Sequence, residues 1–313
     1  MSDIVITEFM DEEAIKEGLT GFDVLYDPKL VDRPEELAKA IAGARALIVR
    51  NRTQVRDSLL NQAPELKVVG RLGVGLDNID VEACKTRNIA VFPATGANDV
   101  SVAEYVICTA MLLLRGAYSA TEEMVTGAWP RNKLMGREIS GKHLGLVGYG
   151  SIAKETAKRA AALGMSVSAY DPYVPPESPQ WEQSWGRVIP STLEELIAKS
   201  DVVSLHLPLT AETRNLIDAA ALGRMKHDAV VINAARGGVI DEAAVADALK
   251  ARRLAGAALD VFDEEPLTSA KAAVFGGCPN LILTPHIAGV TVESNIRVSW
   301  VTVENVRKHL QKA

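Results

Sequence analysis

The chain has little of what marks secreted, membrane or disulfide-stabilised proteins. Its 313 residues contain three cysteines, Cys84, Cys108 and Cys278, which are far apart and form no CxxC pair. Structural disulfides are therefore not expected, and the cysteine content suits a reducing compartment. The longest apolar run, residues 106–114, is too short to cross a bilayer, and the N-terminus has no basic segment followed by an apolar one. We expect a cytoplasmic protein.

The sequence also lacks any block of basic residues. Its formal charge at pH 7 is −6, so neither nucleic acid nor an anionic membrane is the expected partner. No HxxxH and no paired Cys/His spacing occurs, so no metal site is predicted. What is present is ordinary for a soluble globular protein: 48% hydrophobic and 24% charged residues, over a length sufficient for two domains.

Short β-rich runs alternate with helical patterns along the chain. The first set of runs is IVITEF, FDVLYD, ALIVRN, LKVVGRLG and IAVFPA, and the second is HLGLVG, MSVSAY, VVSLHL, AVVINA, GAALDV and NLILTP. Such alternation predicts an α/β fold with two doubly wound parallel-sheet domains. We expect domains at residues 1–97 with 289–313 and at 98–288, since one long apolar helix starts near residue 98 and a final amphipathic helix over 291–312 should pack back on the first domain.

A dinucleotide fingerprint opens the second set. Strand HLGLVG runs into Gly148-x-Gly150 and directly into a helical pattern, with the small Ala153 at the third position. The next strand ends in Asp171, at the spacing of an acid that binds ribose hydroxyls, and the next basic residue is Arg187. The cofactor should therefore be NAD, not NADP, bound by a Rossmann domain through Asp171 and the turn residues Tyr149, Gly150, Ser151 and Ile152.

Three chemically competent residues each follow a strand of this domain. Arg236 lies in NAARGGVID, Glu265 in LDVFDEEP and His286 in TPHIAG. Because ligands in open α/β sheets lie beyond the carboxyl ends of strands, all three should face the fingerprint crevice. In these motifs, their order and their spacing, the chain resembles the D-isomer-specific 2-hydroxyacid dehydrogenases over essentially its whole length. The resemblance implies that these are the catalytic Arg, Glu and His, and that the first domain is a flavodoxin-like substrate domain.

The chemistry of the three residues agrees with that reaction. Hydride exchange between C2 of a 2-hydroxy acid and nicotinamide needs a proton acceptor for the hydroxyl and a cation for the carboxylate. His286 has the intrinsic pKa for the first task, and Glu265 beside it would orient the imidazole and stabilise the imidazolium. Arg236 supplies a planar fork for the carboxylate.

The resemblance also assigns the remaining site residues. It implies that the cofactor is lined by Val102, His206, Pro208, Thr213, Ala234, Asp260 and Gly289, and that the substrate contacts Asn98 and the backbone N–H groups of Leu72, Gly73 and Val74, a plausible anion nest. The loop Arg50-Asn51-Arg52 follows strand ALIV and would hold an anionic substrate tail; surface ion pairing is the alternative reading of these arginines.

The substrate we favour is therefore a D-configured 2-hydroxy acid with an anionic tail. In the phosphoglycerate dehydrogenase branch of the family a basic loop holds the distal phosphate, and we place (S)-sulfolactate slightly ahead of 3-phosphoglycerate. The alternatives are a hydroxypyruvate or glyoxylate reductase, a formate or phosphite dehydrogenase, and an NAD(H)-sensing corepressor-like binding protein. Segment 126–136, which in the family crosses to a second subunit, carries Trp129 and other apolar residues, so we expect a homodimer built on the cofactor domains.

Overall fold

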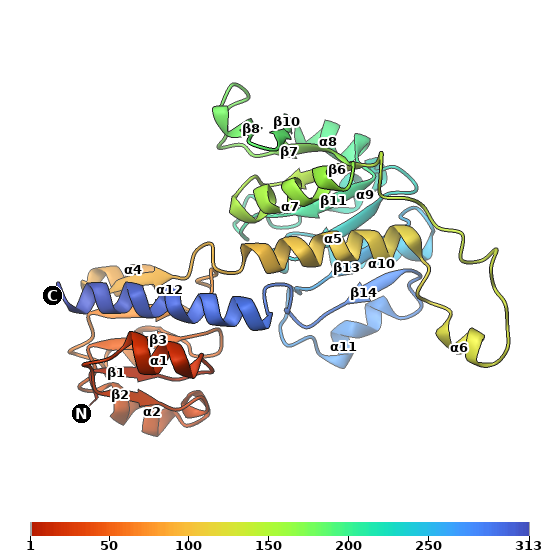
Figure 1. Ribbon diagram of the computed structural model, residues 1–313. Coiled ribbons are helices and arrows are strands. Elements are labelled where there is room, and N and C mark those ends of the chain that lie inside the picture. The colour runs from red at the N-terminus through yellow and green to blue at the C-terminus, as the bar shows by residue number, and fades with distance from the viewer. Residues whose placement is uncertain (1, 313) are drawn as a thin grey trace. The chain divides into compact units, whose positions relative to one another are not determined.

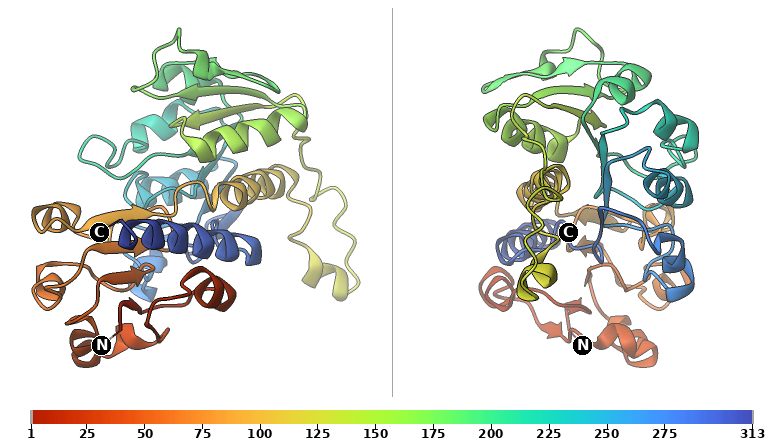
Figure 2. Two further views of the ribbon diagram at one scale, coloured as in Figure 1. Left: turned by 60° about the vertical axis from the view of Figure 1, so that its left-hand side comes forward. Right: turned by 90° about the vertical axis from the view of Figure 1, so that its right-hand side faces the viewer.

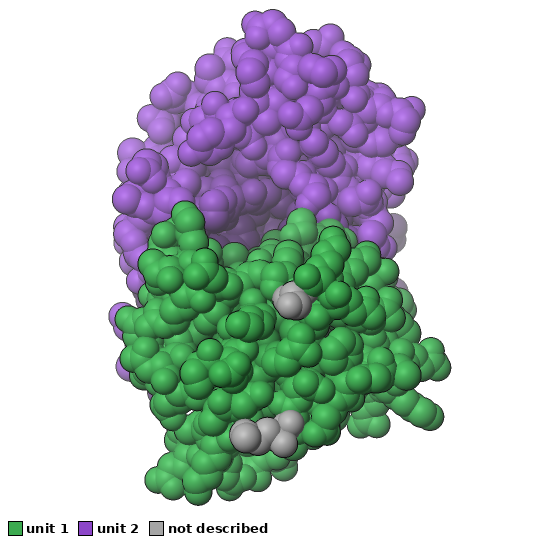
Figure 3. Space-filling view, turned by 90° about the vertical axis from the view of Figure 1, so that its left-hand side faces the viewer, with its two compact units in different colours: residues 1–98, 290–313 green, residues 99–289 purple. Residues whose placement is uncertain are grey.

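The computed structural model describes residues 2–312, which divide into two compact units (Figure 3). Unit 1 comprises residues 1–98 and 290–313, and unit 2 comprises 99–289. Each boundary lies one residue beyond the predicted one. Within the described residues no helix combines the length and the apolar character needed to cross a membrane.

Unit 1 contains a five-stranded parallel sheet with the order β2-β1-β3-β4-β5. This is the flavodoxin-like order, whose switch point lies between β1 and β3. Figure 1 labels β1, β2 and β3 of this sheet. The elements of unit 1 are β1 Ile4–Ile6, α1 Glu12–Gly18, β2 Val24–Tyr26, η1 Leu30–Asp32, α2 Pro34–Ile41, β3 Ala46–Val49, α3 Asp57–Leu60, β4 Val68–Arg71, α4 Val81–Thr86, β5 Ala90–Pro93 and α12 Val292–Leu310.

Unit 2 is a seven-stranded parallel sheet with the order β10-β7-β6-β11-β12-β13-β14. Taken in chain order, its first six strands have the Rossmann order 3-2-1-4-5-6, so the predicted fold class is confirmed. The elements of unit 2 are α5 Asp99–Arg115, α6 Thr121–Val125, β6 His143–Val147, α7 Ser151–Ala162, β7 Ser166–Tyr170, η2 Pro179–Trp181, β8 Glu182–Gln183, β9 Gly186–Arg187, β10 Ile189–Pro190, α8 Leu193–Lys199, β11 Val202–Leu205, α9 Ala219–Arg224, β12 Val230–Asn233, α10 Glu242–Lys250, β13 Gly256–Leu259, α11 Ser269–Ala272, η3 Ala273–Phe275 and β14 Leu281–Leu283.

Alternating strand residues divide each core into two layers. In unit 1, Ile4 and Ile6 pack with α1 and α12, whereas Val5 between them packs toward α2 and α4. In unit 2, α5 and α7 cover one face of the sheet and α8, α9 and α10 cover the other, as both views in Figure 2 show. Strands buried on both faces explain the continuous apolar runs in the sequence. Because the helices cover the two faces of each sheet, a ligand is expected at the carboxyl ends of the strands.

Helix α12 returns to unit 1, as expected, and begins with a capping box. Thr291 accepts a hydrogen bond from the Ser294 N–H, and the Ser294 hydroxyl accepts one from the Thr291 N–H. The helix packs on α1 and β4, where Gly70 leaves room for its side chains: a Cβ at Gly70 would lie 2.7 Å from a Val306 methyl group. The last helix is therefore part of the core of unit 1.

Candidate active site

The turn between β6 and α7 has the form of a phosphate-binding turn. Gly148 has φ +94°, and a Cβ on it would lie 2.3 Å from the His206 carbonyl oxygen, so this position is closed to any side chain. A Cβ on Gly150 would meet no atom of the described residues within 4 Å, and no side chain caps the start of α7 there. The first N–H groups of α7, including those of Ser151 and Ile152, can thus receive an anion.

Asp171 is fixed beside this turn by two backbone groups. Its carboxylate accepts hydrogen bonds from the N–H of Tyr149 and from the N–H of Tyr173, both at 2.9 Å. The acid at the end of β7 is therefore held at the same edge of the sheet as the glycine turn. Its position fits the predicted role in binding ribose hydroxyls.

The other residues predicted to line the cofactor also belong to unit 2. His206, Pro208 and Thr213 follow β11, Ala234 follows β12, Asp260 follows β13 and Gly289 follows β14, whereas Val102 lies in α5. His206 shares a 2.9 Å hydrogen bond between its Nε2 and the Ser204 hydroxyl, and burial lowers its pKa to about 4. An imidazole with so low a pKa is a weak base that holds almost no proton at neutral pH, which suits a wall of the site better than a proton carrier.

Glu265 and His286 form a close pair at the ends of β13 and β14. The His286 Nδ1 lies 2.7 Å from a Glu265 carboxylate oxygen, and the other carboxylate oxygen accepts the N–H of Phe262 at 3.0 Å. A carboxylate only accepts, so the His286 Nδ1 carries the hydrogen, and its Nε2 is the atom that can gain or lose a proton. The His286 side chain is 47% exposed, so the imidazole is accessible from solvent.

Arg236 completes the group after β12. Burial works against ionisation of Glu265, but hydrogen bonds from His286 and from a backbone N–H, helped by the charge of Arg236, outweigh it and lower the pKa of this carboxyl. Gly237 explains the glycine that follows Arg236: a Cβ there would lie 1.8 Å from the Phe262 carbonyl oxygen. A fixed carboxylate, an accessible imidazole and a guanidinium therefore occupy one edge of unit 2.

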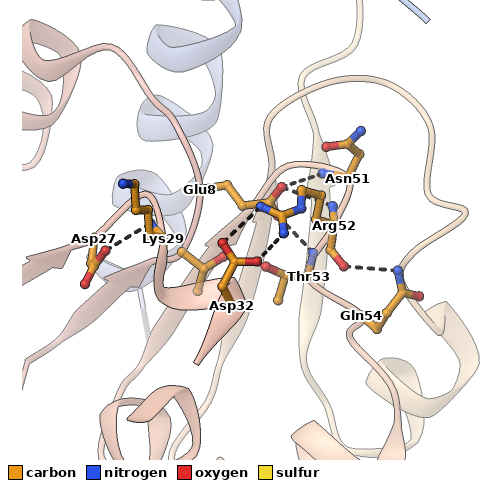
Figure 4. A network of polar contacts seen from close by, with 9 residues as sticks. Glu8, Asp27, Lys29, Asp32, Asn51, Arg52, Thr53 and Gln54 are labelled. Atoms are coloured by element: carbon orange, nitrogen blue, oxygen red, sulfur yellow. Dashed lines mark hydrogen bonds and ion pairs between the residues drawn. The ribbon is translucent and has the colours of Figure 1, made fainter. Parts of the chain in front are cut away.

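The arginine loop of unit 1 is held by a residue that sequence reasoning did not single out. Glu8 follows β1, is 4% exposed and accepts the N–H groups of four consecutive residues, Arg50 to Thr53. Figure 4 shows Glu8 with the last three of them. The Glu8 carboxylate oxygens lie 2.9, 3.3, 3.0 and 3.0 Å from the nitrogens of Arg50, Asn51, Arg52 and Thr53. The loop therefore lies at the switch point of the unit 1 sheet, where ligands of such sheets bind, with its backbone donors already used.

Both arginine side chains of this loop have partners inside unit 1. The Arg52 guanidinium pairs with Asp32, and their side chains are 57% and 51% exposed. Arg50 contacts the Asn295 side chain and donates to the Phe9 carbonyl oxygen at 3.3 Å. Surface ion pairs of the Arg52–Asp32 kind contribute about 0–1 kcal/mol, so the pair opposes an anionic ligand only weakly.

The loop after β4, which was predicted to bind the substrate carboxylate through its backbone N–H groups, differs from expectation. The N–H of Leu72 donates to the Val49 carbonyl oxygen and the N–H of Gly73 to the Arg71 carbonyl oxygen, at 2.8 and 2.9 Å. These two N–H groups serve the fold of unit 1, so the prediction that they form the anion nest needs correction. Of the three residues, Val74 stays a candidate, and the Arg71 guanidinium, which lies against Gly73, is a cation that the sequence reading had not assigned.

Asn98 lies at the boundary between the units. Its side-chain Oδ1 is buried without a hydrogen-bond partner among the described residues. A buried acceptor of this kind is costly unless a ligand or water supplies a donor. This observation fits the predicted contact of Asn98 with substrate, which stays a prediction.

We expect the Glu8 carboxylate to stabilise unit 1 in a pH-dependent way. Burial opposes its ionisation, but the N–H groups of Thr53, Arg50 and Arg52 outweigh it and lower its pKa from the ordinary value of 4.5. A lowered pKa gives stability that is fully present above pH 4.5 and is lost as the pH falls through the lower value. Glu8→Gln should therefore cost roughly 2 kcal/mol or more near pH 7, and the difference should shrink in acid.

Thermal unfolding of the wild type and of Glu8→Gln from pH 3 to pH 7 measures this effect. The matched control is Glu12→Gln, since Glu12 is exposed in the first turn of α1 and should change stability by less than about 0.5 kcal/mol. A difference between wild type and Glu8→Gln that stays constant over this pH range would contradict the prediction.

Comparisons with known proteins agree on one family. The sequence model described as "D-isomer specific 2-hydroxyacid dehydrogenase, NAD binding domain" matches residues 107–288. An (S)-sulfolactate dehydrogenase of Chromohalobacter salexigens is 54% identical over 310 residues, which cover 99% of both chains. A D-3-phosphoglycerate dehydrogenase of Methanocaldococcus jannaschii is 38% identical over 311 residues, 99% of this chain and 58% of the relative. The crystal structure of an Aquifex aeolicus D-lactate dehydrogenase complexed with NAD and lactic acid aligns with a TM-score of 0.83 and 28% identity, covering 99% of this chain and 96% of the other.

Proposed function

Since the chain belongs to the D-isomer-specific 2-hydroxyacid dehydrogenases and is an NAD-dependent oxidoreductase, we propose that it oxidises (S)-sulfolactate to the 2-oxo acid and catalyses the reverse reduction. The predicted family, enzyme class and cofactor are thus confirmed, and the substrate is the proposal. The observation that carries it is the 54% identity to an (S)-sulfolactate dehydrogenase, which extends over 99% of both chains. The second candidate is 3-phosphoglycerate, favoured by the 38% identity to D-3-phosphoglycerate dehydrogenase.

The residues of unit 2 supply the acid–base chemistry of this reaction. NAD, when bound, supplies the hydride acceptor at its nicotinamide ring. The His286 Nε2 takes the proton of the C2 hydroxyl during oxidation and returns it during reduction, because Nδ1 is occupied by Glu265. Glu265 stays ionised and stabilises the imidazolium, and Arg236 binds the substrate carboxylate.

The stereochemistry follows from the family. A sulfomethyl group outranks a carboxylate in naming priority, so the D arrangement is labelled S in sulfolactate although it is R in lactate and phosphoglycerate. Mirror-image substrates should not react.

The anionic tail is proposed to bind at the loop of Arg50, Asn51 and Arg52. Because Glu8 uses the backbone N–H groups of this loop, the side chains are left to recognise the tail. The salt bridge of Arg52 to the exposed Asp32 is weak, and a sulfonate or phosphate offers the guanidinium a stronger, doubly hydrogen-bonded partner.

We expect Arg52→Ala to lower kcat/KM about ten- to hundredfold for sulfolactate, the loss of a charge-assisted contact, but hardly at all for hydroxypyruvate, whose tail is uncharged. The measurement is steady-state kinetics with sulfolactate, 3-phosphoglycerate, hydroxypyruvate and glyoxylate in both directions. Arg87→Ala is the matched control, because Arg87 forms a similar ion pair with Asp57 at 2.9 Å but precedes β5, at the opposite edge of the sheet. Equal losses for charged and uncharged tails would assign Arg52 to structure.

We also propose that the protein is a cytoplasmic homodimer built on unit 2. Residues 116–141, including α6, extend away from the rest of unit 2 (Figure 1) and expose Val125, Trp129 and Met135 by 81%, 78% and 85%. The same unit has a mainly apolar groove of about 530 Å³ lined by α5 and α7, including Ile107 and Met111. An apolar arm and an apolar groove on one chain suit exchange between two copies.

Light scattering should report a dimer at micromolar concentration. Trp129→Ser combined with Met135→Asp should shift it toward monomer because both changes remove exposed apolar surface. A wild-type monomer at this concentration would refute the proposal.

A further inference from the structure

A chain of three side chains in unit 2 has no part in the proton transfer itself. Tyr105 lies in the middle of α5, Thr284 directly follows β14 and Asp260 directly follows β13. The Tyr105 hydroxyl lies 2.6 Å from the Thr284 hydroxyl, and the Thr284 hydroxyl lies 2.6 Å from a carboxylate oxygen of Asp260. Asp260 is 1% exposed, so the inner end of this chain is shielded from water.

The direction of the hydrogen bonds in this chain follows from donor counting. A threonine hydroxyl has one hydrogen, and Thr284 gives it to the Asp260 carboxylate, which only accepts. The hydrogen in the other bond must therefore come from Tyr105. Burial raises the pKa of Tyr105 to about 12, so the phenol keeps its proton throughout the neutral range.

Asp260 in turn holds the backbone around His286. Its two carboxylate oxygens accept the N–H groups of Ile287 and Ala288, both at 2.8 Å, and its carbonyl oxygen accepts the N–H of His286 at 2.7 Å. His286 has φ +56°, a left-handed backbone that costs about 1–3 kcal/mol outside glycine and persists where the surroundings fix it. Asp260 makes three of the bonds that fix it.

We propose that Tyr105 and Thr284 are positioning residues for His286: they orient the Asp260 carboxylate, which fixes the backbone at residues 286–288 and thereby places the imidazole. This inference rests on the proposed function, because it takes His286 as the proton carrier. It assigns a task to a tyrosine 179 residues away in sequence from its partner.

Tyr105→Phe tests the hydrogen bond between Tyr105 and Thr284 by removing the tyrosine hydroxyl group. We expect kcat to fall about three- to tenfold, as for the loss of one buried hydrogen bond, while the Kd of NADH, followed by its fluorescence, and the KM of the 2-oxo acid change less than twofold. Thr284→Val, which keeps the shape and removes both bonds, should lose about tenfold or more in kcat. Thr284→Ser, which keeps the hydroxyl, should restore most of the rate.

The double variant Tyr105→Phe with Thr284→Val distinguishes one chain from two separate contacts. If Tyr105 acts through Thr284, the double variant is no slower than Thr284→Val alone, whereas independent contacts would give multiplied losses. Tyr26→Phe is the matched control, since it removes a part-buried tyrosine hydroxyl that donates to the Met10 carbonyl oxygen at 3.2 Å in unit 1; its kcat should equal that of the wild type.

A normal kcat in Tyr105→Phe, or multiplied losses in the double variant, would overturn the proposal. If Thr284→Val fails to fold, the comparison of kcat between Tyr105→Phe and Tyr26→Phe still tests the proposal. Failure of the proposed function shows differently: His286→Ala would then keep its rate, whereas an inactive His286→Ala beside a fully active Tyr105→Phe refutes the positioning role alone.

Discussion

His286→Ala should lose about 10²- to 10⁴-fold in kcat, the range for removal of a general acid–base group, while binding NADH almost as tightly as the wild type. The reason is that its Nε2 is the proposed proton acceptor for the C2 hydroxyl. The other histidine assigned to this edge of unit 2, His206, is a weak base, because burial lowers its pKa to about 4. Single-turnover oxidation of NADH by the 2-oxo acid measures the chemical step, and NADH fluorescence measures binding.

Two variants accompany this prediction. His227→Ala is the control, because His227 is exposed and precedes β12 at the amino ends of the strands; it should be fully active. Glu265→Gln should lose less activity than His286→Ala and move the pH optimum of reduction toward acid, because the imidazolium loses the carboxylate that stabilises it. A His286→Ala enzyme with a normal rate would refute the assignment.

Asp171→Ala should erase most of the preference for NAD over NADP. In the wild type the carboxylate is expected to bind the two ribose hydroxyls and to repel a 2′-phosphate, so NAD is strongly preferred. Removing it should raise the KM of NAD about 10²-fold, through loss of two charge-assisted hydrogen bonds, with little gain for NADP. The measurement is kcat/KM for both cofactors.

Glu177→Ala is the control that distinguishes recognition of the cofactor by Asp171 from an effect of the net charge of the protein. Glu177 is exposed six residues after Asp171, so its removal changes the net charge equally but should leave the cofactor ratio unchanged. If both variants shift the ratio alike, or if the wild type uses NAD and NADP equally, Asp171 does not discriminate between them.

Much of the fold could be predicted from the sequence, because most of the parallel strands are buried on both faces and therefore read as apolar runs. The runs that became β1 and β6 and the long helix α5 are examples. The short strands β8, β9 and β10, two residues each, were not predicted: two residues carry no periodicity, and the surrounding Pro-rich stretch reads as loop. Their pairing depends on β7 and on each other rather than on local propensity.

The candidate site could be predicted where a chemically active residue directly follows a strand. It could not be predicted where it depends on contacts between residues that are far apart in the sequence. Arg236, Glu265 and His286 could be recognised in the sequence because each is a charged or titratable residue that follows an apolar run. Glu8 looks like a surface acid in the sequence, although its place after a buried strand at the switch point was a usable signal. The hydrogen bond from the Leu72 N–H to the Val49 carbonyl oxygen is a tertiary contact that no local pattern indicates, whereas the one from the Gly73 N–H to the Arg71 carbonyl oxygen lies within a local turn.

The Glu8 contacts also bear on how the proposed tail-binding loop, and with it the substrate range, could be altered. The backbone of this loop is held by hydrogen bonds to the buried Glu8 carboxylate, so it should keep its conformation when its exposed side chains are changed. Asn51 and Arg52 are exposed on that fastened backbone, so each could be exchanged for residues that suit neutral or branched tails while the loop keeps its course. Libraries limited to these two positions, with Glu8 left in place, are therefore the economical starting point for redirecting this dehydrogenase.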